Sequence, residues 1–259
     1  MRFDGEAVVV TGAAHGIGRG IARAYLEEGA RVAVWDFRED ALEEAVHAID
    51  REGSRTLAQM VDVRDARAVT AAMDAVMSWA PECAILVNAA GTYPSHPLLD
   101  MAESDWDAVL DTNLKGPLFT TQAFARHLAA RGRGGCIVNI SSGSANSARI
   151  GAAHYATSKA GLNMLTRSMA LELAPLGIRV NVVSPGYVEV NSAFNPLSQA
   201  YKDAISDGIP LGRPGRPDDI ARAVLFLTGP ESEWMTGSIV SVDGGSGAGR
   251  AHLPLSRPE

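Results

Sequence analysis

Short apolar runs alternate with longer amphipathic segments from one end of the chain to the other. The runs are rich in Val, Ile and Ala and predict β-strands, whereas the segments between them repeat apolar residues at helical spacing. This alternation predicts an α/β fold of the Rossmann type, with a doubly wound, mainly parallel seven-stranded sheet and helices on both faces. We expect strands at residues 7–11, 31–35, 56–61, 85–88, 135–140, 179–184 and 239–242.

The longest predicted helix carries a local conflict. Ser104 is its expected N-cap, and Asn113 lies inside it, followed closely by Gly116 and Pro117. Such residues disfavour a regular helix and indicate either a functional site or a structural kink. The helices as a set are expected at residues 19–28, 41–52, 65–79, 104–130, 154–173, 198–205 and 217–227.

The first strand runs into a glycine-rich turn. Gly12, Gly16 and Gly18 lie between that strand and the helix after it, an order that lets the backbone turn tightly and approach a pyrophosphate. The helix N-terminus adds free N–H groups and a positive dipole end. The order of elements predicts nucleotide binding, although three glycines by themselves also fit a plain strand-to-helix connection.

Asp36 ends the second strand, roughly 20 residues past the glycines. A carboxylate at this position suits hydrogen bonds to an adenosine 2′-hydroxyl and repels a 2′-phosphate. His15 and Arg38 both bring positive charge that suits a 2′-phosphate, whereas Phe37 brings none. The balance predicts NAD as the cofactor, with NADP the less favoured choice.

Other strand ends carry further candidates for cofactor contact. Asp62 suits either an adenine amino group or the cap of the next helix, and Val63 is expected to pack on the adenine ring. The small residues from Asn88 to Gly91 would let a ribose lie against the backbone. Pro185 and Gly186 follow the sixth strand and are expected to turn the chain across the nicotinamide.

Tyr155 and Lys159 lie four residues apart in a predicted helix, so that an ammonium group stands beside a phenol. A nearby cation favours the phenolate, and lowering its pKa by roughly three units takes about 4 kcal/mol. Ser142 lies where an apolar strand emerges into a loop, at the sheet edge that binds ligands in open α/β folds. Tyr-x-x-x-Lys alone is weak evidence, and this context favours a proton-transfer site.

The composition is that of an ordinary globular protein, with 46% hydrophobic and 20% charged residues. A net charge of -7 gives no support to binding of nucleic acid or a membrane surface. Cys83 and Cys136 are expected to be buried thiols, and no His/Cys/Glu spacing predicts a metal site. The chain has no signal-peptide pattern, so a cytoplasmic location is expected.

The irregular stretch 187–213 predicts a lid or binding loop. Residues 1–247 are expected to form a single dinucleotide-binding and catalytic domain, and 248–259 a C-terminal tail.

Taken together, the motifs resemble those of the short-chain dehydrogenase/reductase family over nearly the whole chain to Gly245. They comprise the glycine turn, Asp36, Asp62, Asn88-Ala89-Ala90-Gly91, Asn113, Ser142, Tyr155-x-x-x-Lys159, Asn181, Pro185-Gly186 and Val242-Asp243-Gly244-Gly245. Two departures are Ala89 in place of a second asparagine and Val190 in place of a threonine that often contacts the nicotinamide carboxamide. That contact is then expected from Val188, Asn191 or Ser192.

The resemblance implies hydride transfer between a nicotinamide cofactor and a secondary alcohol carbon. Tyr155 would transfer the hydroxyl proton, Ser142 would hold the substrate oxygen, and Lys159 would lower the tyrosine pKa and bind the ribose. Asn113 would anchor a water through its backbone carbonyl. The residues implied to contact the cofactor are Gly12, His15, Gly16, Ile17, Gly18, Asp36, Phe37, Asp62, Val63, Asn88, Ala89, Ala90, Gly91, Tyr155, Lys159, Pro185, Gly186 and Val188.

Three functions remain open from the sequence. The favoured one is an NAD(H)-dependent oxidoreductase that interconverts a small secondary alcohol, of the polyol, sugar or cyclic type, and its ketone. The alternative is a 3-oxoacyl thioester reductase that uses NADPH, and a remote one is a non-catalytic nucleotide-sensing protein. The resemblance also implies a homotetramer joined through the helices that bear Asn113 and Tyr155, and through the last helix and strand.

Overall fold

The computed structural model of the protein describes residues 1–190 and 198–249. Within them, seven strands form one sheet in the order β3-β2-β1-β4-β5-β6-β7, and every neighbouring pair is parallel. The predicted Rossmann-type sheet is therefore confirmed. Its strands are β1 (Ala7–Thr11), β2 (Arg31–Asp36), β3 (Thr56–Met60), β4 (Ile85–Asn88), β5 (Gly135–Ile140), β6 (Ile178–Pro185) and β7 (Ile239–Val242).

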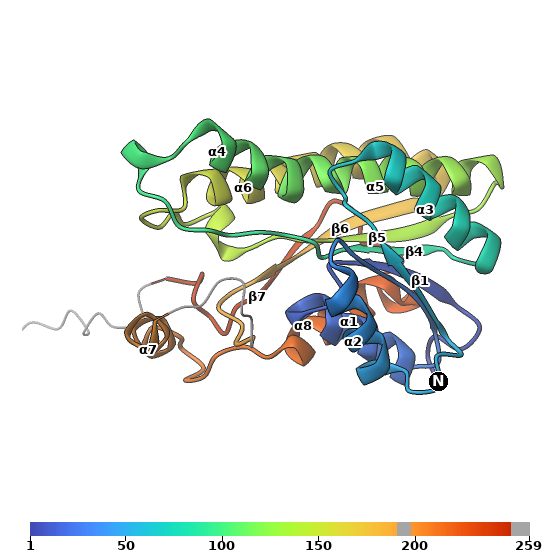
Figure 1. Ribbon diagram of the computed structural model, residues 1–259, viewed down its shortest axis with the longest axis horizontal. Helices are drawn as coiled ribbons and strands as arrows, with labels where there is room; N and C mark the ends of the chain where they lie inside the picture. Colours follow the sequence, from blue (N-terminus) through green and yellow to red (C-terminus); the bar gives the residue numbers. More distant parts are fainter. Residues whose placement is uncertain (191–197, 250–259) are drawn as a thin grey trace, which may run out of the picture.

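Helices cover both faces of the sheet, with α3, α4, α5 and α6 on one side and α1, α2 and α8 on the other (Figure 1). Successive residues of β1 point to opposite faces, so Val8 and Val10 join one buried cluster while Ala7 and Val9 join the other. The helices are α1 (Gly16–Glu27), α2 (Glu39–Ile49), α3 (Ala66–Trp79), α4 (Glu103–Leu110), α5 (Gly116–Ala130), α6 (Ala153–Leu173), α7 (Gln199–Asp207) and α8 (Pro217–Thr228).

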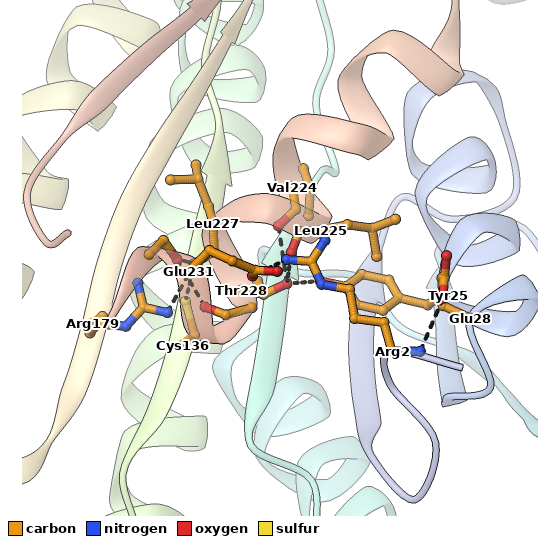
Figure 2. Close-up of polar contacts among 12 residues, drawn as sticks. Arg2, Tyr25, Glu28, Cys136, Arg179, Val224, Leu225, Leu227, Thr228 and Glu231 are labelled. Atoms are coloured by element: carbon orange, nitrogen blue, oxygen red, sulfur yellow. Dashed lines mark hydrogen bonds and ion pairs between the residues drawn. The ribbon is translucent and has the colours of Figure 1, made fainter. Parts of the chain in front are cut away.

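The position of α8 matters for the site because α8 packs on α1, the helix that begins at the glycine turn. A Cβ on Gly20 would lie 2.5 Å from the Cβ of Pro217, so glycine permits this close approach. At the other end of α8, the Leu227 carbonyl accepts from Arg179, and Thr228 hydrogen-bonds the Tyr25 hydroxyl at 2.7 Å (Figure 2). These contacts fix α8 against β6 and α1.

The long predicted helix is divided in the structure. A π-helical turn, η2 (Asp111–Lys115), separates α4 from α5, so the conflict predicted around Asn113 corresponds to a real irregularity. Ser104 is not the N-cap, because α4 begins at Glu103 after Ala102. The Asp105 carboxylate accepts from the Ala102 N–H at 3.1 Å and thereby satisfies the start of the helix.

The remaining boundaries agree with the expected ones to within a few residues. Ser198 caps α7 through its side chain, while residues 191–197, including Asn191 and Ser192, lie outside the described part of the chain. The tail from residue 250 onward lies outside it as well. Among the described residues, no helix is long and apolar enough to cross a membrane.

Candidate active site

The glycine turn at the end of β1 depends on its glycines. Gly12 has a φ of +63°, and a Cβ there would lie 2.6 Å from the Cα of Ala90. A Cβ on Gly18 would lie 2.2 Å from the Gly12 carbonyl oxygen. The turn thus delivers the chain directly into α1 at Gly16, whose first N–H groups have no acceptor within the helix. This arrangement fits the pyrophosphate of a dinucleotide.

Asp36 lies buried next to the glycine turn. Its carboxylate accepts from the Ala14 N–H at 3.2 Å and the Arg38 N–H at 3.3 Å. The Arg38 guanidinium lies 3.6 Å from the same carboxylate and also contacts His15, and burial together with Arg38 lowers the pKa of His15. Phe37 is exposed. Both cationic side chains considered in the sequence therefore gather around the acidic one.

The Asn88 side chain belongs to a buried polar chain. Its Oδ1 accepts from Thr120 at 2.6 Å, and its Nδ2 donates to Asn139 at 2.8 Å. Asn139 in turn donates to Thr166 at 2.8 Å. These four side chains join α5, β4, β5 and α6 beneath the site. The sequence analysis did not single out Asn139, although an amide within an apolar strand was a signal that could have identified it.

Beyond Asn88, the chain is held against β1. Thr11 Oγ1 accepts from the N–H groups of both Ala89 and Ala90 at 3.1 Å. Gly91 then lines the cavity described below. The departure at Ala89 is accommodated because the hydroxyl of Thr11 holds this loop.

The three residues expected to carry the chemistry meet at one cavity. Tyr155 and Ser142 both line it, and Ser142 Oγ accepts from the Ser144 N–H at 3.1 Å. One turn further along α6, Lys159 donates from Nζ to the Ile140 carbonyl at 2.8 Å, and its Nζ lies 5.8 Å from the centre of the Tyr155 ring. The strand end and the helix face predicted from sequence are thus adjacent in space.

Burial shifts the pKa values of both members of this pair. Burial lowers the pKa of Lys159 to about 8. Burial also raises the pKa of Tyr155, against the opposing effects of the Ser142 hydrogen bond and the charge of Arg149. In the chain by itself, desolvation of the phenolate outweighs the nearby positive charge. The predicted lowering of the tyrosine pKa includes the positive charge of an oxidised nicotinamide, so for the enzyme with cofactor bound it stays a prediction.

Asn113 lies fully buried in the π-helical turn, and its side chain clamps the loop after β4. Oδ1 accepts from the Thr92 N–H at 2.8 Å, while Nδ2 donates to the Thr92 carbonyl at 2.8 Å and to Ser158 Oγ at 3.1 Å. Asn113 does not line the cavity among the described residues, so its side chain acts on the site through Thr92. Its expected role as a water anchor stays a prediction.

Asp62 is occupied by Arg64, which donates to it from the backbone and from the guanidinium, at 2.6 Å for the shortest contact. This ion pair holds the pKa of Asp62 below its usual range. The capping alternative is wrong, because Asp65 caps α3 instead. Val63 is buried and packs near Gly116, where a Cβ would lie 2.8 Å from Val63 Cγ2. The adenine contacts proposed for both residues stay predictions.

The cavity has a volume of about 1060 Å³ and extends from the glycine turn to α7. Its wall also includes Tyr93, Arg149, Tyr201 and Lys202, which belong to the segments 92–96, 143–150 and 190–210 that are expected around the cleft from sequence. None of the four was singled out, because loop conformation decides which side chains point inward. The described lining residues from the expected set are His15, Gly16, Ile17, Gly91, Ser142, Tyr155, Lys159, Pro185, Gly186 and Val188. Gly12, Gly18, Asp36, Phe37, Asp62, Val63, Asn88, Ala89, Ala90 and Asn113 are outside that lining.

Other side-chain chemistry is less prominent. Cys83 and Cys136 are both buried free thiols, as expected, and burial raises their pKa values to about 12 and about 11. In residues 1–190 and 198–249, no group of His, Cys, Asp and Glu side chains is arranged to hold a metal ion.

Comparison with known proteins agrees with this arrangement. The sequence profile of a family described as "Enoyl-(Acyl carrier protein) reductase" matches residues 12–247. The 3-oxoacyl-(acyl-carrier-protein) reductase of Thermotoga maritima is 36% identical over 245 residues, covering 95% of this chain and 99% of the relative. The galactitol 2-dehydrogenase (L-tagatose-forming) of Cereibacter sphaeroides is 39% identical over 250 residues, covering 95% and 96%.

A solved structure gives the same result at the level of the fold. The short-chain type dehydrogenase/reductase from Mycobacterium marinum superposes with a TM-score of 0.87 at 36% identity, covering 94% of this chain and 96% of that one. Together with the parallel sheet, the glycine turn and the Ser142, Tyr155 and Lys159 cluster, these likenesses show that the chain belongs to the short-chain dehydrogenase/reductase family and is an oxidoreductase of CH-OH groups.

Proposed function

We propose that this enzyme interconverts 3-hydroxyacyl and 3-oxoacyl compounds, carried as thioesters, and that it uses NAD(H). The observation that carries the substrate class is the wall of the cavity beyond Tyr155, where Tyr93, Tyr187, Tyr201 and Ile205 offer apolar and aromatic surface to an acyl chain. The likeness to a 3-oxoacyl-(acyl-carrier-protein) reductase supports the same class. We thus favour the 3-oxoacyl thioester, which was the alternative substrate in the sequence analysis, over the polyol.

The chain's own residues divide the work in this proposal. Ser142 donates a hydrogen bond to the carbonyl oxygen, and Tyr155 gives or takes the proton at that oxygen. Lys159 keeps its charge close to the tyrosine and reaches toward the ribose, while the buried Asn113 clamp holds the Thr92 loop in place. A bound nicotinamide would supply the hydride acceptor or donor.

The preference for NAD rests on Asp36. Its carboxylate lies beside the glycine turn, where it suits a ribose 2′-hydroxyl and disfavours a 2′-phosphate. Arg38 and His15 are basic side chains that would favour a 2′-phosphate. However, Arg38 is paired with Asp36, and burial lowers the pKa of His15, which disfavours its charged form. We therefore keep NAD as the proposed cofactor.

A second candidate substrate is a polyol. The hydroxyl groups of Ser142, Ser144 and Ser147 line the same cavity and suit a hydroxylated molecule. The 39% identity to a galactitol 2-dehydrogenase favours this reading as well.

Initial rates distinguish the two candidates. Acetoacetyl-coenzyme A, galactitol and a cyclic alcohol would each be assayed by absorbance of the reduced nicotinamide, with NAD(H) and with NADP(H). Turnover of the thioester with NADH supports the proposal. Galactitol oxidation without thioester turnover would replace the first candidate by the second, and a strong preference for NADPH would overturn the role given to Asp36.

We further propose a homotetramer, as the family resemblance implies. The apolar side chains of Leu114, Leu118 and Leu165 line a surface hollow of about 400 Å³ between α5 and α6, and Met164 and Leu171 are exposed on α6. Monomeric proteins rarely leave such apolar groups together at the surface. Light scattering coupled to size-exclusion chromatography tests the assembly, and a monomer at micromolar concentration would refute it. A cytoplasmic location stays a prediction.

A further inference from the structure

Two cationic side chains in the wall of the cavity have no protein partner. Arg149 lies in the loop before α6, Lys202 lies on α7, and both are half-buried. Across residues 1–190 and 198–249, neither side chain makes a hydrogen bond or ion pair. By contrast, Arg31 holds Glu82 at 2.9 Å, and Arg179 donates to two carbonyl groups. A cation that lines a cavity without a protein partner is available to an anionic ligand.

The other charged groups in the wall do not neutralise these two. Asp243 is the one carboxylate among the described lining residues, and it already accepts from the N–H groups of Gly245 and Gly247 at 2.9 Å. Lys159 adds a further cation that donates to a carbonyl. The cavity therefore presents an excess of positive charge in a protein whose net charge is -7.

The two cations share one cavity with the residues expected to carry the chemistry. Arg149, Lys202 and Tyr155 all line it, and the positive charge of Arg149 opposes the rise in the pKa of Tyr155. Lys202 belongs to α7, which lies apart from both helical layers (Figure 1) and contributes Tyr201 and Ile205 to the same wall. An anion bound to either side chain would therefore occupy the same cavity as the substrate whose oxygen meets Tyr155.

We propose that Arg149 and Lys202 bind an oxyanion of the substrate, either a carboxylate or a phosphate. A guanidinium binds such groups through two parallel hydrogen bonds, and an ammonium group adds a point charge. The carboxylate would come from a free 3-oxo acid, and the phosphate from the carrier portion of a thioester. The phosphate case rests on the proposed function, because it assigns the charged part of the same thioester, whereas the carboxylate case would extend the substrates of the same site to free 3-oxo acids.

Substrates that share the reacting 3-oxo group and differ in the charge they carry test the proposal. Acetoacetate is compared with ethyl acetoacetate, and acetoacetyl-coenzyme A with acetoacetyl-N-acetylcysteamine. We expect the anionic member of at least one pair to have a KM lower by about tenfold, or 1.4 kcal/mol. A lower KM for acetoacetate than for its ethyl ester would identify the bound group as a carboxylate. A lower KM for the coenzyme A thioester than for the N-acetylcysteamine thioester would identify it as a phosphate. Equal KM values within both pairs would overturn the proposal.

Variants assign the effect to the two side chains. R149Q and K202Q should each raise the KM of the anionic substrate by about fivefold to twentyfold. The KM of the neutral substrate should stay within about twofold of the wild-type value. R67Q, at an exposed site on α3 outside the cavity, is the matched control and should change neither. If R149Q impaired the neutral and anionic substrates equally, its role would be limited to Tyr155 and the proposed anion site would be excluded.

A binding measurement separates failure of this inference from failure of the proposed function. Calorimetric titration of the protein with NADH present compares butyrate with butyramide, and adds coenzyme A as the phosphate-bearing probe. If no 3-oxo compound reacts, the proposed function fails, yet butyrate or coenzyme A binding that R149Q weakens would still support the anion site. Identical binding of butyrate and of coenzyme A to the wild type and to R149Q would overturn the proposed anion site.

Discussion

Replacing Asn113 by alanine tests whether this residue acts through its side chain. The change removes one acceptor and two donors, and it leaves the N–H and carbonyl of Thr92 without their partners at 2.8 Å. Each unsatisfied backbone group costs about 1–3 kcal/mol, less where water can reach it. Because Thr92 is half-buried, we expect a total loss of about 3 kcal/mol.

For a chain of this size, that loss corresponds to a Tm lower by roughly 6–12 °C. Activity should fall further than stability suggests. A Cβ on Gly91 would lie 3.3 Å from Asn113 Oδ1, so this side chain supports the part of the loop that lines the cavity. Displacing a positioning loop by about 1 Å can cost about 100-fold in rate. We expect kcat/KM to decrease by roughly that factor.

Thermal unfolding and initial-rate assays of N113A, measured beside N146A, provide the check. Asn146 is exposed in the loop after β5 and is a matched control because its truncation should leave both Tm and kcat/KM unchanged. Alanine keeps the backbone carbonyl at position 113. Wild-type Tm and rate in N113A would therefore refute the clamp and leave only a role for that carbonyl.

Three further changes test the site. Y155F should abolish nearly all turnover while NADH binding, followed by fluorescence titration, stays within threefold; substantial remaining activity would exclude Tyr155 as the proton-transfer group. D36N keeps an acceptor for the Ala14 N–H and frees Arg38, so the ratio of kcat/KM for NADP over NAD should rise by about tenfold, and an unchanged ratio would mean that other residues read the ribose. His154 is buried, accepts from the Tyr155 N–H at 2.9 Å, and faces His96, Asp105 and Arg149. Burial lowers its pKa, so the unfolded chain binds the proton more readily and the free energy of unfolding should fall as pH drops below about 6.5. Urea unfolding at pH 7.5 and 5.5 should show a smaller fall for H154Q, and identical pH dependence in both proteins would contradict this assignment.

Local patterns in the sequence determined the sheet and its helices. Strand and helix periods are properties of short segments, so β1, β4 and β7 have the predicted bounds. The helices differ by a few residues, except for the predicted helix over 104–130, which is divided. The need for glycine at positions 12 and 18 could also be predicted from sequence. The backbone groups that a Cβ there would meet lie in the same turn or directly after β4. The i, i+4 spacing of Tyr155 and Lys159 places both on one face of α6 whatever surrounds that helix.

Tertiary structure decided everything that depends on burial or on partners distant in the chain. It brought His15 and Arg38 together beside Asp36. It also set how far burial raises the pKa of Tyr155 in the chain by itself, because the cost of desolvating a phenolate depends on how deeply the ring is enclosed.

The same holds for the features that were missed. The buried chain through Asn139 joins residues 51 positions apart, and the cations Arg149 and Lys202 come from the loop before α6 and from α7. The sequence shows which charged and amide side chains are present. Their spacing predicts how those close together in the chain are arranged. Whether an amide finds a partner or a cation remains open to a ligand is decided by packing between distant segments, which no local pattern encodes.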